Sequence, residues 1–261
     1  MKKADLHLHT NISDGTRSPE SLIDYIEYVK DFDKVYITDH NRIEGSIIAR
    51  SYALSREYKI EIGIGSEVST SKCHMIALDI KKNIKKGLTP LHSAEEILSQ
   101  GGFPIIAHPF NPFNFSRRHS GGRKVIEDLL LRDIPFAIEY NGSMDYSTLI
   151  YQEGSVFRKK SSISSANKKA LDIADEYSIP IVASSDAHMG RVIGSAYTLY
   201  EDDLISNIKS NKIKINYNFT KRNIGIPYFS YHLLLDPLPI PKKYKRNIVR
   251  YVMNRKEKDI I

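Results

Sequence analysis

The feature that most constrains the fold of this sequence is an alternation of short apolar runs with longer amphipathic stretches. Such alternation is typical of parallel βα units, in which each strand is followed by a helix that packs on the sheet. The third and fourth runs follow each other without an amphipathic stretch between them. We expect strands near residues 4–7, 35–38, 61–65, 73–78, 104–107, 136–139 and 180–183.

The clearest helix pattern covers residues 19–30. Ser18 precedes this stretch as a candidate N-cap, and Pro19 occupies the first helical position, where its missing N–H costs nothing. Leu22 and Ile26 belong to an apolar face with helical spacing. Further helices are expected at residues 44–57, 94–100, 124–132, 168–177 and 202–209.

The chain has 261 residues, and closed α/β barrels of this length form one domain. Residues 211–219 and 236–241 show no regular pattern. We therefore expect an α/β fold with a barrel over residues 1–220. Residues 221–261 would form a short, basic C-terminal extension packed on that barrel.

The net charge of +7 is concentrated near the end of the sequence. Residues 240–261 contain eight basic and two acidic side chains, which leaves 30 basic and 29 acidic side chains in the preceding residues. A basic tail could contact nucleic acid, although it could equally be an ordinary surface segment. No apolar run approaches the ~18 residues of a membrane span, and a single cysteine, Cys73, fits a reducing compartment. We expect a cytoplasmic protein without a membrane partner; its oligomeric state cannot be read from the sequence.

Histidines and carboxylates recur at the ends of the expected strands. His7 and His9 are two residues apart in an extended segment, so both side chains project from one face. In a parallel barrel the carboxyl ends of the strands meet on one face, where active sites of this fold lie. Nine such groups crowded together would repel one another unless cations lay between them. The set suits two or three divalent ions, with zinc, manganese or iron favoured: His7, His9, Asp14, His40, Glu67, His74, His108, Asp186 and His188.

Taken in order, these motifs resemble those of the polymerase and histidinol phosphatase (PHP) family. The resemblance runs from about residue 3 to 195 and rests on His7-Leu8-His9, Asp14, Thr38-Asp39-His40, Glu67 with His74, Ala107-His108-Pro109 and Ser185-Asp186-Ala187-His188. Residues Glu139-Tyr140-Asn141-Gly142 and Asn167 also match family-like positions. The resemblance implies a distorted (β/α)7 TIM-like barrel that hydrolyses phosphate esters with a metal-activated water.

By position, the resemblance also distributes the ligands among the ions. One ion would take His7, His9, Glu67 and Asp186; a second Glu67, His74 and His108; and a third Asp14, His40 and His188. Glu67 would bridge two ions, and Asp39 would orient His40 or a neighbour. The groups expected to serve catalysis are Asp39, His40, Glu67, Asp186 and His188. The leaving group would be stabilised by a third ion, or protonated by His188 or His40 if either is not committed to a metal.

The substrate is less constrained than the chemistry. Arg117, Arg118, His119 and Arg191 are candidate phosphate-binding residues, although the first three could also form a solvated basic loop. Only 33 residues separate His74 from His108, which leaves no room for a large cap domain. A phosphorylated metabolite, a nucleotide and a nucleic-acid end all remain open. Alternative functions are a nucleic-acid-binding subunit that uses the basic tail and an amidohydrolase.

Overall fold

The structure is a computed structural model, and it describes residues 1–111, 122–145 and 164–217. The expected extension 221–261 lies outside the described residues. The elements, in chain order, are β1 (Lys2–Leu8), α1 (Pro19–Val29), β2 (Lys34–Ile37), α2 (Glu44–Ser55), β3 (Glu61–Ser69), β4 (His74–Leu78), α3 (Pro90–Ser99), β5 (Phe103–Ile106), α4 (Gly122–Leu130), β6 (Ala137–Asn141), α6 (Ser165–Glu176), β7 (Ile181–Ser184), η1 (Gly190–Val192), β8 (Ala196–Tyr200), α7 (Leu204–Lys209) and β9 (Lys214–Tyr217).

The described strands form one sheet in the order β7-β6-β5-β4-β3-β2-β1-β8-β9. Most neighbours among β1–β7 are parallel, but β4 is antiparallel to both β3 and β5. The parallel arrangement typical of βα units is therefore broken at β4, where the sequence lacks an amphipathic stretch between two strands. A parallel pair needs a crossover of a dozen or more residues, whereas only the short turn after Ser69 joins β3 to β4. His74 thus lies at the amino end of its strand and still at the same barrel end as the other candidate ligands.

The barrel closes between β1 and the segment after β7. Leu8 pairs with Ala187 in parallel, and the amide of His9 donates to the carbonyl oxygen of Ala187 over 3.0 Å. Toward the other end, β8 pairs with the start of β1, and the Thr198 hydroxyl donates to the carbonyl oxygen of Ala183 on β7 over 2.9 Å. The strand β8 therefore fills the seam at one end only. This confirms the distorted TIM-like barrel.

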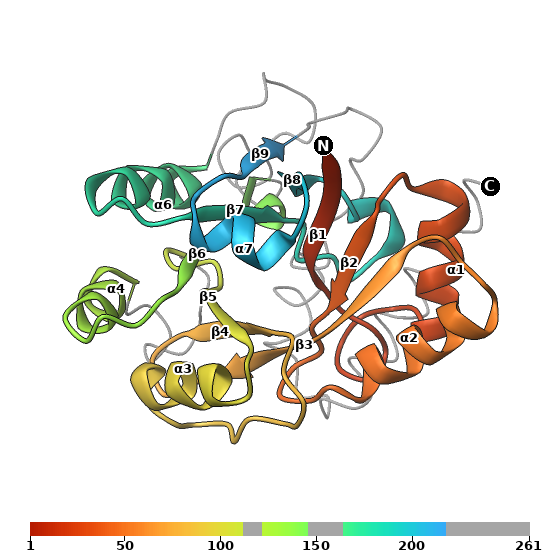
Figure 1. Ribbon diagram of the computed structural model, residues 1–261, viewed down its shortest axis with the longest axis horizontal. Helices are drawn as coiled ribbons and strands as arrows, with labels where there is room; N and C mark the ends of the chain where they lie inside the picture. Colours follow the sequence, from red (N-terminus) through yellow and green to blue (C-terminus); the bar gives the residue numbers. More distant parts are fainter. Residues whose placement is uncertain (112–121, 146–163, 218–261) are drawn as a thin grey trace, which may run out of the picture.

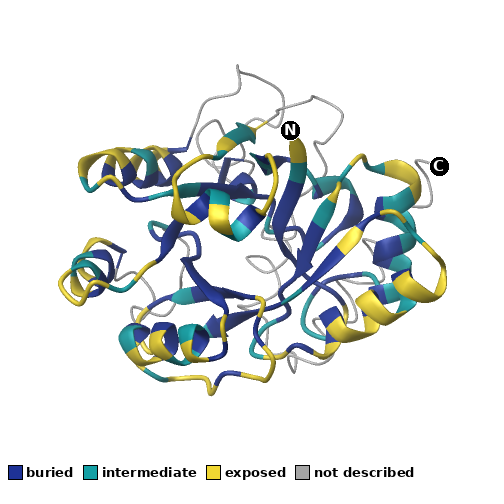
Figure 2. Cartoon of the chain, viewed as in Figure 1, coloured by how far each residue is buried: buried dark blue, intermediate teal, exposed yellow. Residues whose placement is uncertain are grey.

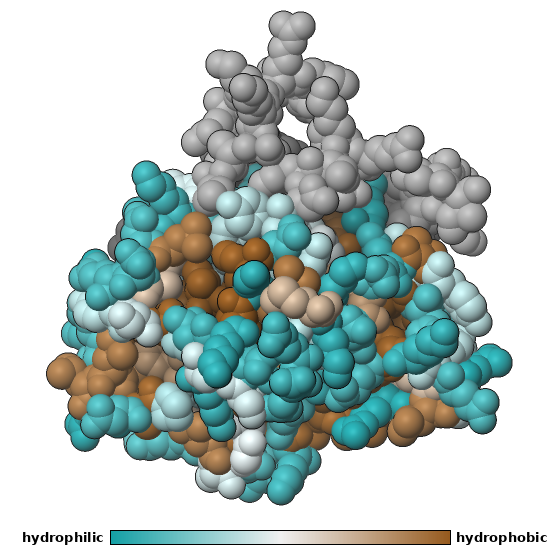
Figure 3. Space-filling model, turned by 45° about the horizontal axis from the view of Figure 1, so that its top comes forward, coloured by the Kyte–Doolittle hydropathy of each residue, from teal (hydrophilic) through white to brown (hydrophobic). Residues whose placement is uncertain are grey.

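Apolar side chains fill the barrel and also lie between the strands and the outer helices. The interior cluster includes Leu6, Tyr36, Ile76 and Phe103, and α7 covers one barrel end with Leu204. Figure 1 looks toward that end, with α7 in front and the other helices around the strands. Strands are mostly buried, while the helices expose their outer faces (Figure 2). On the face drawn in Figure 3, hydrophobic residues form separate patches between hydrophilic ones.

The helices begin where capping side chains occur. Ser18 accepts a hydrogen bond from the amide of Ser21 over 3.2 Å, which confirms the expected start of α1. Helix α3 begins four residues earlier than expected because Thr89 accepts from the amide of His92 over 3.2 Å. No helix among the described residues is both long enough and apolar enough to cross a membrane.

Two strands were not expected. β8 (Ala196–Tyr200) carries alternating buried and half-buried residues, and β9 (Lys214–Tyr217) pairs with it in antiparallel register. The expectation that residues 211–219 are irregular is therefore wrong over β9. This strand has four residues and exposes Lys214, so it contains no apolar run that would mark a strand in the sequence.

We predict that Gly63→Ala destabilises the barrel. An ideal Cβ atom at Gly63 would lie 2.2 Å from Cε1 of Tyr36, whose ring is fully buried in the interior. Overpacking of this kind costs about 1–3 kcal/mol of unfolding free energy, which urea denaturation would measure. Tyr36→Leu removes the clash, so the double variant should lose less stability than the sum of the single variants. Strict additivity of the two losses would contradict this packing argument.

Candidate metal centre

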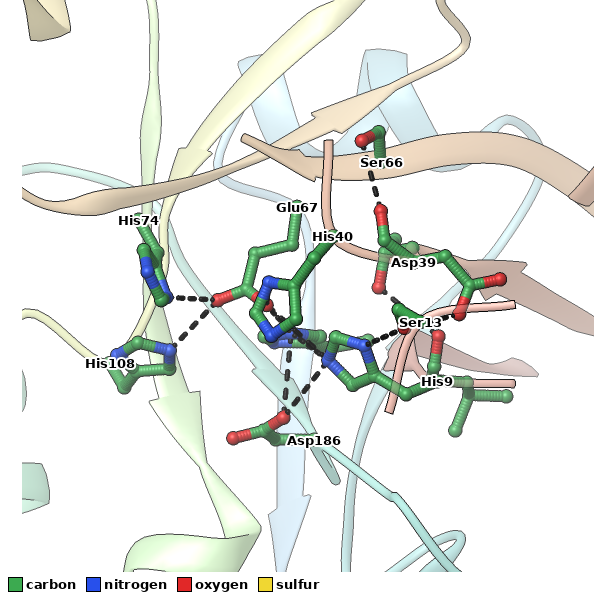
Figure 4. Close-up of polar contacts among 12 residues, drawn as sticks. His9, Ser13, Asp39, His40, Ser66, Glu67, His74, His108 and Asp186 are labelled. Carbon is green, nitrogen blue, oxygen red and sulfur yellow. Dashed lines mark hydrogen bonds and ion pairs between the residues drawn. The ribbon is translucent and has the colours of Figure 1, made fainter. Parts of the chain in front are cut away.

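All nine candidate ligand side chains lie at one end of the barrel, where their ring nitrogens and carboxylate oxygens approach one another. Figure 4 shows Glu67 in the middle, with His74 and His108 on one side and His9 and Asp186 on the other. The side chains come from the ends of β1, β2, β3, β4, β5 and β7 or from the residues just after them. The residues between His74 and His108 form β4, α3 and β5, which confirms that no large cap is inserted there.

Four of these side chains form an inner group: His7, His9 and Glu67, which are buried, and Asp186, whose side chain is 16% exposed. The Nε2 atoms of His7 and His9 are 3.0 Å apart, and each lies 3.3 Å from Oε2 of Glu67. Oδ1 of Asp186 is 3.5 Å from Nε2 of His7 and 3.4 Å from Nε2 of His9. A tetrahedral ion with bonds of about 2.0–2.1 Å requires ligand atoms about 3.3–3.4 Å apart. The donor set and its spacing therefore fit a divalent transition-metal ion.

The second carboxylate oxygen of Glu67 faces a different pair of histidines. Its Oε1 lies 2.8 Å from Nδ1 of His74 and 3.0 Å from Nε2 of His108. Oε2, which faces the inner group, is also 3.0 Å from Nδ1 of His40. One carboxylate thus touches rings on both of its oxygens, as a bridge between two ions would.

Asp14 is at the centre of an outer group that also contains His40 and His188. Its Oδ2 lies 3.4 Å from Nε2 of His40, and its Oδ1 lies 3.4 Å from Nε2 of His188. His9 joins this group through Nδ1, which is 3.6 Å from Oδ1 of Asp14. The side chains of Asp14 and His40 are 23% and 29% exposed, whereas that of Glu67 is 1% exposed. The outer group is therefore more open to solvent than Glu67 and the two inner imidazoles.

The electrostatics of the cluster favour protons or cations between the carboxylates. Burial alone would lower the pKa of His9, but the hydrogen bonds that its ring donates to Asp186 and Glu67 outweigh burial and raise the pKa to about 9. Burial would likewise raise the pKa of Glu67, but His40, His74 and other histidines hold it well below its usual range. The carboxylates stay ionised, and cations can replace the protons that the imidazoles otherwise hold.

Two candidate ligands stand on strained backbone. His108 has φ of +29° and Asp186 has φ of +51°, a region that side-chain-bearing residues occupy at a cost of about 1–3 kcal/mol. The amide of His108 donates to Oε2 of Glu139 over 2.7 Å. The carbonyl oxygen of Asp186 accepts from the Ser143 hydroxyl over 3.1 Å. These contacts hold both side chains toward the cluster.

Glu139, at the end of β6, is a site residue to which sequence reasoning gave no role. It is fully buried, and its Oε1 accepts a hydrogen bond from Nδ1 of His7 over 2.8 Å and another from the Ser184 hydroxyl. Asn141 donates from Nδ2 both to Oε2 of Glu139 and to Oδ2 of Asp186, each over 3.1 Å. Glu139 therefore fixes the tautomer of His7, so that its Nε2 faces the inner group. Its position after a strand, like that of the other ligands, was the available signal.

Asn167, which the family resemblance picked out, supports this arrangement from helix α6. Its Oδ1 accepts from the amide of Asn141 over 3.0 Å, and its Nδ2 donates to the carbonyl oxygen of Asn141 over 2.8 Å. Asn167 thereby hydrogen-bonds both the backbone amide and the carbonyl oxygen of Asn141, the last residue of β6.

Asp39 anchors the loop that follows β1. Its carboxylate accepts hydrogen bonds from Thr10 and Ser13 of that loop. It accepts from the amide and the hydroxyl of Thr10 over 2.8 Å and 2.6 Å, and from the Ser13 hydroxyl over 2.6 Å. Ser13 also lies 3.4 Å from Nδ1 of His9. Asp39 thus positions the segment that carries Asp14.

Asp5 plays the corresponding part for the segment after β7. It accepts from the amide of Ser185 over 2.9 Å and from that of Gly194 over 3.1 Å, on either side of His188. Burial raises the pKa of Asp5 to about 6.

The candidate substrate-binding residues are less defined than the ligands. Arg191 is half-buried in η1, close after His188, and its Nη2 lies 3.8 Å from Sδ of Met189. Arg117, Arg118 and His119 lie outside the described residues. Their roles stay predictions.

We predict that Glu139→Gln weakens metal binding about 10–100-fold. A glutamine amide cannot accept from both His7 and the His108 amide, because one of its ends is a donor. Isothermal titration calorimetry of the metal-free protein with Zn²⁺ or Mn²⁺ measures the metal affinity. Glu95→Gln, at an exposed position on α3, provides the matched control. Equal affinities in the two variants would show that Glu139 does not position the ligands.

We also predict that metal affinity rises with pH. The pKa of His9 in the metal-free protein is about 9, so below that value an incoming ion must displace its proton. The stabilisation from protonated His9 is complete below its unfolded pKa of about 6.5 and is lost as the pH rises through about 9. Calorimetric titrations between about pH 6 and about pH 9, in buffers of different ionisation enthalpy, should show proton release that declines with pH. A pH-independent affinity would contradict this account.

Comparisons with known proteins agree with this geometry. Residues 164–213 match the PHP-associated family, PHP_C. An uncharacterized protein of Methanocaldococcus jannaschii is 36% identical over 121 residues, which make up 42% of this chain and 69% of that protein. A 5'-3' exoribonuclease of Haemophilus influenzae is 31% identical over 103 residues, or 38% of this chain and 36% of that enzyme.

A solved structure shares the fold. It is a two-domain protein from Bacteroides vulgatus containing a predicted PHP-like metal-dependent phosphoesterase, with a TM-score of 0.61 and 15% identity. The similarity covers 83% of this chain and 64% of that one, so this chain spans less than two thirds of the solved protein. On these matches, and on the cluster that its strand ends build, the chain belongs to the polymerase and histidinol phosphatase (PHP) domain family.

Proposed function

We propose that this protein is a metal-dependent phosphoesterase that hydrolyses its substrate at the outer group of the cluster. The observation that supports this most directly is the division of the ligands by depth around one shared carboxylate. His7, His9 and Glu67 are buried, whereas Asp14, His40 and His188 are open to solvent. A substrate that arrives from solvent therefore meets the outer group first.

Divalent ions, when bound, would neutralise the phosphate oxygens and lower the pKa of a coordinated water toward neutrality. Zinc, manganese and iron suit the imidazole-rich donor set. His7, His9, Glu67 and Asp186 would hold one ion, His74 and His108 a second one with Glu67, and Asp14, His40 and His188 a third.

His188 has a defined geometry toward the opening. Its Nδ1 lies 3.1 Å from the carbonyl oxygen of Asp186, which can only accept, so Nδ1 carries the hydrogen. Nε2 is then left to face Asp14 at the mouth of the cluster. When no third ion is held there, His188 or His40 in its protonated form is placed to give a proton to the leaving oxygen of the substrate. Asp186 and Glu67 stay ionised and hold the ligands in place.

The substrate falls in the class of phosphate esters, which includes phosphorylated metabolites, nucleotides and nucleic-acid ends. Arg191 is the described basic residue nearest in sequence to His188, and it is a candidate contact for the phosphate.

We predict that the full chain loaded with Mn²⁺, Zn²⁺ or Fe²⁺ hydrolyses aryl phosphate esters, and that Asp186→Asn lowers kcat/KM at least about 100-fold. The substitution removes a charge that lies within 3.5 Å of two inner imidazoles. Phosphate mono- and diesters should be assayed beside an amide and a lactone.

Asp79→Asn is the matched control. Asp79 lies after the far end of β4, accepts from the Tyr36 hydroxyl over 2.9 Å and has φ of +54°, which asparagine tolerates. It should retain activity. Inactivity of the metal-loaded protein on both ester classes, or turnover of the amide or lactone alone, would refute the proposal.

A further inference from the structure

Four exposed basic side chains lie beside the opening of the candidate metal centre, on the side formed by β2, β3 and β4. We call them the basic rim: Arg42, Lys72, Lys85 and Lys86.

The positions of Arg42 and Lys72 follow from their short sequence separation from two candidate ligands. Arg42 follows His40 by two residues, and Lys72 precedes His74 by two residues in a turn closed by a 3.0 Å hydrogen bond from the amide of Thr70. Two residues span at most about 7 Å of chain. The backbone of Arg42 and that of Lys72 therefore each lie close to a candidate ligand.

Lys85 and Lys86 reach the same edge through hydrogen bonds on both sides of them. Before them, Oδ1 of Asn83 accepts from the amide of Ile43 over 2.8 Å, at the start of α2. After them, the amide of Gly87 donates to the carbonyl oxygen of Ser69 over 2.7 Å, at the end of β3. Between these points Ile84 is buried in the core. The two lysines are therefore held between the start of α2 and the β3–β4 turn.

The charge of the basic rim is not neutralised by the described part of the chain. None of its four side chains forms an ion pair with a carboxylate among residues 1–111, 122–145 and 164–217. Helices α2 and α3 also begin at this edge, so their amino-terminal ends add positive potential. Glu44 is the exposed acid there, and its Oε1 accepts from Nδ2 of Asn83.

Two other lysines of the same connection lie elsewhere. The amides of Lys81 and Lys82 both donate to Oε1 of Gln100, at the end of α3, over 2.9 Å and 3.0 Å. Nζ of Lys82 lies 3.5 Å from Oε1 of Glu96. This pair has the same composition as Lys85 and Lys86 but lies toward the far end of α3, so it supplies a matched control.

We propose that the basic rim binds backbone phosphates of a single-stranded nucleic acid while one of its phosphate esters occupies the candidate metal centre. A small phosphorylated molecule would be held by the cluster itself and would leave the basic rim without a partner. A strand carries further phosphates beyond the reacting one, and a row of exposed lysines and arginines attracts them without reading the bases. This assignment of substrate class rests on the proposed phosphoesterase function.

The test compares two double charge reversals in the full chain: Lys85→Glu with Lys86→Glu, and Lys81→Glu with Lys82→Glu. Both are made in the Asp186→Asn background, so that binding is measured without turnover. The probe is a fluorescein-labelled single-stranded oligonucleotide of about a dozen nucleotides, and anisotropy gives its affinity as a function of salt. Each lost phosphate contact should reduce the slope of log affinity against log salt by about 0.7 and cost about fivefold at 0.1 M salt.

The Lys85/Lys86 reversal should therefore weaken binding about 25-fold and reduce the salt slope by about 1.4. The Lys81/Lys82 reversal should leave both near the parent values, and Lys85→Arg with Lys86→Arg should retain binding. Equal losses in the two reversals, or an unchanged slope, would overturn the proposal. Equal affinity for inorganic polyphosphate would also overturn it, because the surface would then select charge alone.

Parallel assays separate this proposal from the proposed function. With Asp186 intact, the parent chain and the Lys81/Lys82 reversal should hydrolyse an aryl phosphate ester at the same rate. If the ester is hydrolysed and the reversals bind the oligonucleotide equally, the basic rim proposal fails and the phosphoesterase proposal stands. If binding behaves as expected but no ester is hydrolysed, the phosphoesterase proposal fails.

Discussion

The buried carboxylate of Glu67 is the group around which the strand ends are arranged. A buried, ionised carboxylate costs several kcal/mol of folding free energy unless opposite charges surround it. Here imidazole rings lie within 3.3 Å of both oxygens of Glu67. Those rings can meet only if the register is fixed. On one side of β3, His40 forms a parallel backbone β-bridge with Glu67. On the other side, Ser69 is paired with His74 in the antiparallel register of β3 and β4. A slip of one residue in β3 would turn Glu67 to the outer face of the barrel and leave the imidazoles without it.

A second layer of polar contacts offsets the strain that the cluster imposes. His108 and Asp186 have positive φ, and neither is glycine. Glu139 holds the amide of His108 and the ring of His7, while Asn141 connects Glu139 to Asp186. His7, His108, Glu139 and Asn141 are buried and the Asp186 side chain is only 16% exposed, so water competes little with these hydrogen bonds. The network positions ligands on three strand ends at once. A conservative substitution at Glu139 should therefore lower the metal affinity more than it lowers the free energy of unfolding.

The sequence predicts the ligands better than their supports. His7 and His9, and Asp186 and His188, are recognisable because spacing and residue type both mark them. Glu139 ends a strand in the same way, but a single carboxylate after an apolar run does not reveal that it will bond a histidine from β1. The reversal of β4 follows from the short turn before it, which the sequence shows. β9 could not be predicted because its local sequence pattern is weak and its pairing with β8 stabilises it as a strand. Pairing between two segments cannot be inferred from the sequence of either segment alone.

The depth of the ligands decides where selectivity can arise. His7, His9 and Glu67 are buried, so substrates cannot be distinguished by contacts with these three side chains. Discrimination must come from the outer group and from the loops around it, as in other barrels whose strand ends hold the chemistry and whose loops choose the substrate. On the side of β2, β3 and β4 those loops expose four basic residues beside the acid Glu44, whereas the ligand Glu67 is directed inward. An anion extending beyond the cluster would thus meet attraction on this side, which favours a substrate with more than one phosphate.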